Sequence, residues 1–135
     1  MTGITPVRSA DELMPGMSFD LGSFVLTREE VLDFARRFDP QPFHLDDDAA
    51  RGSLFGRLVA SGLHTFSAAV GHLIRSGLLA EVNLGAGGAE LTWPAALDPD
   101  TPVAMRVTVE ENRPSRSKPG MAVVTLRYRV ATVPD

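Results

Sequence analysis

The segment from Arg57 to Glu81 constrains the fold more than any other part of the sequence, because apolar residues lie on nearly every side of the helix it would form. The apolar positions are Leu58, Val59, Leu63, Phe66, Ala69, Val70, Leu73, Ile74, Leu78 and Leu79. A helix without a polar face is a buried helix. Polar residues interrupt it too often for a membrane span, which needs about 20 apolar residues. We therefore expect other parts of the chain to enclose this helix.

Four segments are expected to form strands: residues 17–27, 89–95, 103–111 and 121–133. Apolar and polar residues alternate in the last two, which is the period of a half-buried strand. In residues 17–27 the apolar positions change parity, so a bulge or tight turn at Gly22-Ser23 is needed to keep them all inside. This order of elements predicts a single α+β domain over residues 1–135, with an antiparallel sheet wrapped around one central helix.

The residues before the long helix predict a shorter one with a fixed start and end. Thr27 to Phe38 has an amphipathic pattern, and Thr27 and Glu30 have the spacing of a capping box. Asp39 precedes Pro40, and a residue before proline is pushed out of the helical region. Asp39 is therefore expected at the helix exit, where the negative end of the helix dipole should make its carboxylate a better base.

A carboxylate and an imidazole, Asp39 and His44, lie five residues apart across a turn that contains Pro40 and Pro42. The two prolines lock φ, which reduces the cost of holding both side chains in one geometry. Such a pair can perform general acid and base chemistry. The alternative is that Asp39 caps a turn and His44 is a partly buried structural histidine.

Ser61 and Gly62 are expected to begin the long helix. Ser61 is a plausible N-cap, and Gly62 falls in the first turn, where amide N–H groups have no helical partner. A glycine there leaves room for a ligand, so its amide could bind a developing oxyanion. The alternative is that Gly62 is only a packing glycine beneath a tight loop.

These features occur together in a known family. The helix that ends in Phe-Asp-Pro-x-Pro-x-His-x-Asp, the stretch from Ala50 to Gly56, the Ala60-Ser61-Gly62 helix start and the late Arg-Pro-Ser-Arg-Ser hairpin resemble the MaoC-like hot-dog dehydratases, the (R)-specific enoyl-CoA hydratase group. The resemblance spans residues 13–133. Two positions depart from it, because many members have histidine at Ser61 and others have asparagine at Gln41, so the roles of those side chains do not transfer.

The resemblance implies a hot-dog fold in a homodimer or dimer of dimers, an acyl-CoA or other acyl-thioester ligand, and reversible hydration of a trans-2-enoyl thioester. Asp39 and His44 fall on the family's catalytic pair, which activates one water, and the Gly62 amide would polarise the thioester carbonyl. Phe43, Ser61, Arg116 and Lys118 are further candidates for substrate binding. No metal or redox cofactor is required. The alternatives are a thioesterase, a non-catalytic acyl-CoA-binding partner subunit and a structural dimer module.

Charge and composition exclude several other classes. With 17 acidic and 13 basic residues, the chain offers no general attraction for nucleic acid. Cysteine is absent, which excludes disulfides and thiol nucleophiles. The first twenty residues lack a signal-peptide pattern, so we expect a cytoplasmic protein without a membrane partner. Arg113, Arg116 and Lys118 could contact the phosphates of coenzyme A, or could form a solvated basic loop.

The remaining polar and aromatic candidates have structural interpretations. His64 and His72 are expected to be hydrogen-bonded core or interface histidines. The run of three aspartates at residues 46–48 is expected to be the capped start of a short helix rather than a metal site. Trp93 is expected to be a packing residue on a strand.

Overall fold

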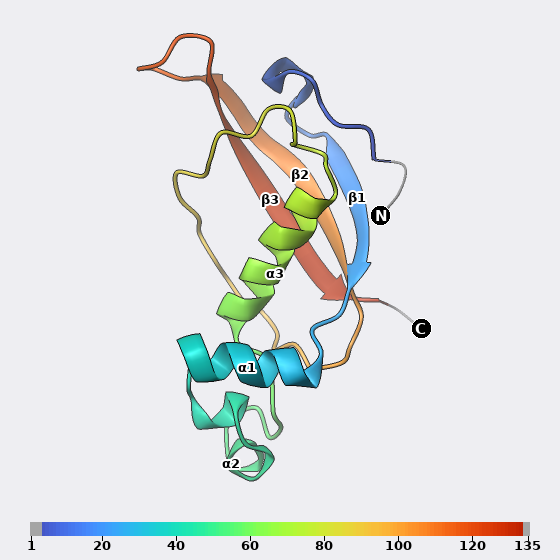
Figure 1. Cartoon of the computed structure of the whole chain (residues 1–135), viewed down its shortest axis with the longest axis vertical. Helices are drawn as coiled ribbons and strands as arrows, with labels where there is room; N and C mark the ends of the chain where they lie inside the picture. Colours follow the sequence, from blue (N-terminus) through green and yellow to red (C-terminus); the bar gives the residue numbers. More distant parts are fainter. Residues whose placement is uncertain (1–3, 134–135) are drawn as a thin grey trace.

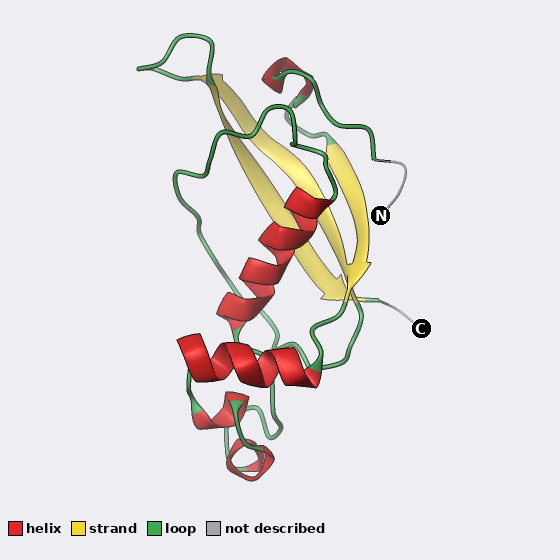
Figure 2. Ribbon diagram, viewed as in Figure 1, coloured by secondary structure: helices red, strands yellow, loops and turns green. Residues whose placement is uncertain are grey.

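The computed structural model describes residues 4–133 and contains a three-stranded antiparallel sheet, in the order β1-β2-β3, against which one long helix lies (Figure 1). In chain order the elements are the 3-10 turn η1 (Ala10–Glu12), β1 (Ser18–Phe24), α1 (Arg28–Phe38), the 3-10 turn η2 (Pro42–His44), α2 (Asp47–Arg51), α3 (Gly62–Arg75), β2 (Val103–Pro114) and β3 (Ala122–Thr132). Figure 2 shows the strands on one side, with α3 along them and α1 and α2 below. The α+β arrangement agrees with the prediction.

β2 is the central strand, and its period-two pattern decides which face meets the helix. Val103, Met105, Val107 and Val109 are all buried, and the last three pack with Ala69 and Leu73 of α3 in the main apolar cluster. β1 contains the predicted irregularity. Its register with β2 shifts between Asp20 and Ser23, where Gly22 has a φ of 74°. The left-handed residue is a glycine, for which this conformation carries no steric cost.

α1 starts and ends where the sequence predicts. The Thr27 hydroxyl accepts a hydrogen bond from the Glu30 amide at 3.2 Å, and the Glu30 carboxylate accepts one from the Thr27 amide at 3.0 Å. The helix stops at Phe38, and Asp39 is its C-cap. These two boundaries fix the position along the chain at which the Asp39 side chain emerges.

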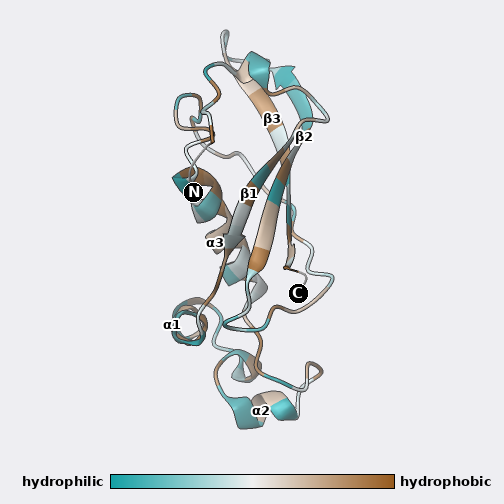
Figure 3. Ribbon diagram, turned by 90° about the vertical axis from the view of Figure 1, so that its right-hand side faces the viewer, coloured by the Kyte–Doolittle hydropathy of each residue, from teal (hydrophilic) through white to brown (hydrophobic). Residues whose placement is uncertain are grey.

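α3 is shorter and less enclosed than expected. It begins at Gly62, as expected, but ends at Arg75 although the apolar segment continues to Glu81, and Figure 3 shows it on one side of the sheet. Leu63 is 43% exposed and Ile74 is 49% exposed, so the sheet of this chain leaves part of the apolar helix surface open. A sheet of three strands covers one face of a helix but does not surround it. None of the helices in the described part of the chain is long and apolar enough to cross a membrane.

His72 fixes α3 against β1. Its Nε2 donates to the carbonyl oxygen of Leu21 at 2.6 Å, and its ring packs beside Phe24 with 5.1 Å between centroids. The structural role expected for this histidine is confirmed.

The strand predicted at residues 89–95 does not form. Residues 83–98 carry no regular structure and return from the end of α3 toward its beginning (Figure 1). A strand needs a partner, and no backbone hydrogen bond joins residues 84–96 to the rest of the described chain. The turn expected between the last two strands is present as the loop between β2 and β3.

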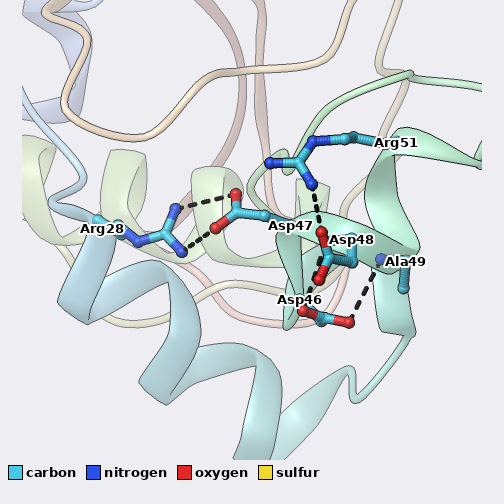
Figure 4. A network of polar contacts seen from close by, with 6 residues as sticks. All are labelled: Arg28, Asp46, Asp47, Asp48, Ala49 and Arg51. Atoms are coloured by element: carbon cyan, nitrogen blue, oxygen red, sulfur yellow. Dashed lines mark hydrogen bonds and ion pairs between the residues drawn. The ribbon is translucent and has the colours of Figure 1, made fainter.

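Charged contacts hold α2 to the start of α1 (Figure 4). The Arg28 guanidinium donates to both carboxylate oxygens of Asp47, at 2.6 and 3.3 Å. Asp46 caps α2 by accepting from the amides of Asp48 and Ala49, and Asp48 pairs with Arg51. The prediction that residues 46–48 begin a capped short helix is confirmed. The turn η2 therefore lies between two helices that are tied to each other.

Candidate active site

Asp39 and His44 come together at the junction of α1, η2 and α3. Asp39 Oδ2 lies 3.3 Å from His44 Nε2, and both side chains are largely buried. Asp39 caps α1 and His44 ends η2, so the two prolines lie in the short connection that brings the side chains together. The arrangement is a close carboxylate–imidazole pair with one side chain from each end of a stiff turn.

A backbone carbonyl fixes which nitrogen of His44 carries a proton. His44 Nδ1 lies 2.6 Å from the carbonyl oxygen of Val59. Because a carbonyl can only accept, Nδ1 is the donor, and Nε2 is the ring nitrogen that faces Asp39. Phe43 supports the ring from its edge with 4.5 Å between centroids, and its carbonyl accepts from the Val59 amide at 3.2 Å.

Both oxygens of the Asp39 carboxylate accept hydrogen bonds from neutral side chains. The Ser61 hydroxyl donates to Oδ2 at 2.7 Å, and the Gln41 amide donates to Oδ1 at 2.8 Å. Burial raises the pKa of Asp39, but these two bonds and the charge of His44 outweigh burial and hold the pKa below its usual value. The expectation that the helix dipole makes Asp39 a better base was therefore wrong in direction, because close donors act more strongly than the helix end.

Ser61 is at the N-cap position of α3 but does not cap the helix. Its side chain is 1% exposed and is directed to Asp39 instead of to the first-turn amides. In the part of the chain that the structure describes, no hydrogen bond uses the amide N–H of Gly62. The pair of Asp39 and His44 therefore lies beside a free helix-end amide.

Sequence reasoning missed two contacts at this junction. Gln41 was regarded as a departure from the family pattern, yet it holds Asp39. Trp93 was assigned to a strand as a packing residue, yet its indole N–H donates to the carbonyl oxygen of Gly62 at 3.0 Å. An amide side chain two residues after the aspartate was a usable signal for the first contact. No local pattern indicates the second, which joins positions 31 residues apart.

The structure does not bring the basic candidates to this junction. Arg116 and Lys118 lie in the loop between β2 and β3, beyond the Pro114–Ala122 end of the ladder. α1 follows β1, whose last residue pairs with Val103 at the opposite end of β2 (Figure 1). The loop and the Asp39–His44 pair therefore lie at opposite ends of the sheet.

His64 differs from the hydrogen-bonded role expected for it. Its ring stacks on Phe34 of α1 with 4.6 Å between centroids and an interplanar angle of 4°. The ring is buried, and Nδ1 has no hydrogen-bond partner among the described residues. Burial lowers the pKa of His64, although the charge of Glu30 acts in the opposite direction.

The site has the components of proton-transfer chemistry. The Asp39 carboxylate is an acceptor, and Nε2 of His44 is one whenever it carries no proton, so a water molecule can then donate one O–H to each of them. The adjacent amide of Gly62 can stabilise negative charge on an oxygen. Within residues 4–133, no three His, Asp or Glu side chains gather in a way that would hold a metal ion.

The chain is similar to a known protein family in both sequence and structure. The family model described as "MaoC like domain" matches residues 11–132. The structure is similar to the MaoC-like dehydratase from Rhodospirillum rubrum, with 41% identity, 90% of this chain and 84% of that chain covered, and a TM-score of 0.82. It is also similar to the (R)-hydratase from A. caviae involved in PHA biosynthesis, with 26% identity, 89% and 86% covered, and a TM-score of 0.60. The uncharacterized protein YdeM of Bacillus subtilis (strain 168) is 27% identical over 86% of this chain and 83% of its own length.

Replacing Ser61 by alanine should raise the pKa of Asp39, because one of the bonds that favour the charged carboxylate is lost. A carbon-13 NMR titration of the Asp39 carboxyl measures the change. Ser53→Ala is the matched control, since the Ser53 hydroxyl donates to the Ala50 carbonyl and not to Asp39. An unaltered Asp39 titration in Ser61→Ala would contradict this account of the carboxylate.

The free energy of unfolding should decrease as the pH falls below the ordinary histidine pKa of 6.5, because His64 takes up a proton less readily in the folded chain than in the unfolded one. The pKa of Asp39 is also lowered, so protonation of Asp39 should reduce the free energy of unfolding further, but only near and below its ordinary pKa of 3.8. Chemical denaturation at about pH 7.5 and about pH 5.5 measures the first effect. His64→Phe keeps an aromatic ring against Phe34 but cannot titrate, so it should flatten this dependence. An equally steep dependence in that variant would assign the effect to other groups.

Proposed function

The chain belongs to the MaoC-like domain family and has the hot-dog fold, and from this premise we propose that it adds water reversibly to a trans-2-enoyl thioester to give a 3-hydroxyacyl thioester. We propose coenzyme A as the thiol carrier. The observation that supports this reaction best is the approach of Asp39 Oδ2 and His44 Nε2 to 3.3 Å beside the free amide of Gly62. Hydration of a conjugated thioester needs a base, a proton donor and an oxyanion site, and this junction offers all three.

In the proposed reaction, the substrate water donates one O–H to the Asp39 carboxylate and the other to His44 Nε2. As the water oxygen bonds to the β carbon, Nε2 takes its proton while Nδ1 keeps the proton that it donates to Val59. The resulting imidazolium faces the Asp39 carboxylate, whose lowered pKa keeps it charged. Nε2 then delivers a proton to the α carbon, so the substrate gains one water and the enzyme is restored.

The Gly62 amide is proposed to bind the thioester carbonyl oxygen. Negative charge moves onto that oxygen when the β carbon is attacked, and a fixed N–H at a helix start is well placed to stabilise it. This amide belongs to the first helical residue, which has no partner within the helix, and no hydrogen bond uses it in the described chain. We propose that Ser61 and Gln41 act as positioning residues that hold the carboxylate, while Phe43 holds the imidazole.

We also propose that two copies of the chain associate. Apolar side chains of α3, including the half-exposed Leu63 and Ile74, lie on the part of the helix that the chain's own sheet leaves open. β3 is an edge strand of 11 residues, and such edges are normally paired or protected. A second copy is the occupant that the hot-dog fold favours for this surface.

Asp39→Asn and His44→Gln should each reduce hydration of short trans-2-enoyl-CoA thioesters by about 10²- to 10⁴-fold. Loss of the conjugated enoyl-thioester absorbance measures the rate, and circular dichroism checks that the variants remain folded. Asp48→Asn, at an exposed aspartate of α2, is the matched control and should retain full activity.

The products distinguish the proposal from its rivals. Release of free thiol would indicate a thioesterase, and binding without turnover would indicate a non-catalytic partner subunit. Wild-type rates in both Asp39→Asn and His44→Gln would refute the assigned roles.

Ile74→Glu should convert an assembly of at least two 14.5 kDa chains into monomers, because it places a charge on the open side of α3. Sedimentation equilibrium measures the mass. Leu54→Glu is the control, because Leu54 is 98% exposed and lies in the loop between α2 and α3. A wild-type protein of monomer mass would refute self-association.

A further inference from the structure

The indole of Trp93 occupies the space above the first residue of α3. A Cβ atom at Gly62 would lie 2.3 Å from Cε2 of the indole and 2.5 Å from Nε1, so no side chain fits between them. The indole N–H donates to the carbonyl oxygen of Gly62 at 3.0 Å. Gly62 therefore allows the flat indole to lie directly against the backbone whose amide belongs to the candidate site.

This contact is also the anchor of an otherwise unattached stretch of chain. Asn83 and Leu97 have backbone hydrogen bonds, to Leu79 and Ala60, but none is formed by the backbone of residues 84–96 in the described structure. Between these ends, the Trp93 indole makes the one hydrogen bond found. Pro94 follows directly and restricts the backbone at that point. The rest of the stretch is mostly exposed and has few packing contacts. The contact with Gly62 is therefore what positions the indole.

Part of Trp93 remains exposed beside this contact. Trp93 is 51% exposed although one side is covered by Gly62. A large aromatic ring that keeps one surface open beside a helix-end amide forms a flat apolar wall for a neighbouring group. Ser61, the residue before Gly62, donates to Asp39, so this wall adjoins the acid–base pair on the same helix start.

We propose that Trp93 is a specificity-determining residue whose indole limits the bulk of the acyl group at the carbon next to the thioester carbonyl. This inference rests on the proposed function, since the carbonyl oxygen is taken to bind the Gly62 amide. The carbonyl carbon and the α carbon bonded to it are the acyl atoms nearest that oxygen. They would therefore lie against the indole. The site accepts an unbranched acyl group and rejects one with a methyl branch at the α carbon.

Two saturated isomers of equal size test the proposal without requiring turnover: butyryl-CoA, which is unbranched, and isobutyryl-CoA, which has the α-methyl branch. Calorimetry should show that wild type binds isobutyryl-CoA about tenfold or more weakly than butyryl-CoA, which is the usual effect of one misplaced methyl group. Trp93→Ala should bring the two affinities to within about threefold. Trp93→Phe, which keeps an aromatic wall but loses the hydrogen bond, should retain most of the discrimination.

Two further measurements test whether the discrimination comes from Trp93 itself. Leu84→Ala changes another exposed apolar residue of the same stretch and should leave the affinity ratio unaltered. Trp93 is also the only tryptophan in the chain, so butyryl-CoA, but not coenzyme A without an acyl group, should change its fluorescence in the wild-type protein. That measurement does not depend on a variant remaining folded.

An affinity ratio that is equal in wild type and Trp93→Ala, or a fluorescence spectrum that butyryl-CoA leaves unchanged, would overturn the proposal. Failure of the proposed function looks different, because wild type would then bind these thioesters but hydrate none of the enoyl forms. If wild type bound neither isomer, both proposals would fall together.

Discussion

The largely buried carboxylate of Asp39 is the constraint on which the site depends. A charged group at this depth is stable only if its oxygens are paired, and here each oxygen accepts a hydrogen bond, from Ser61 and from Gln41. Ser61 comes from the start of α3 and Gln41 from the turn after α1, so satisfying the carboxylate brings these two helices to a common junction. The same bond that pairs Asp39 leaves the first amides of α3 uncapped by Ser61.

Much of this arrangement could be predicted because it follows from local rules. The capping box of Thr27 and Glu30 and the proline after Asp39 fix both ends of α1, and the alternation in residues 103–111 identifies the helix-facing side of β2. The bulge near Gly22 follows from the change of apolar parity in β1. The approach of Asp39 to His44 follows from their spacing across two prolines. Each of these inferences depends on residues close together in the chain.

The errors arose where distant residues decide the outcome. Residues 89–95 have a strand-like composition, but a strand also needs a partner, and the chain does not provide one there. Enclosure of α3 was inferred from its apolar residues, yet a three-stranded sheet leaves part of the helix open. The direction of the Asp39 pKa shift depends on a hydroxyl 22 residues away, which no local pattern identifies. The same is true of the indole that lies on Gly62.

The bond between His44 Nδ1 and the Val59 carbonyl has a stereochemical consequence. It occupies one ring nitrogen and prevents the imidazole from turning over, so proton exchange is confined to Nε2 and to one side of the ring. If hydration proceeds as proposed, the hydroxyl and the new hydrogen are supplied from a single direction. Both would then add to the same face of the double bond, a syn addition that yields one enantiomer of the product.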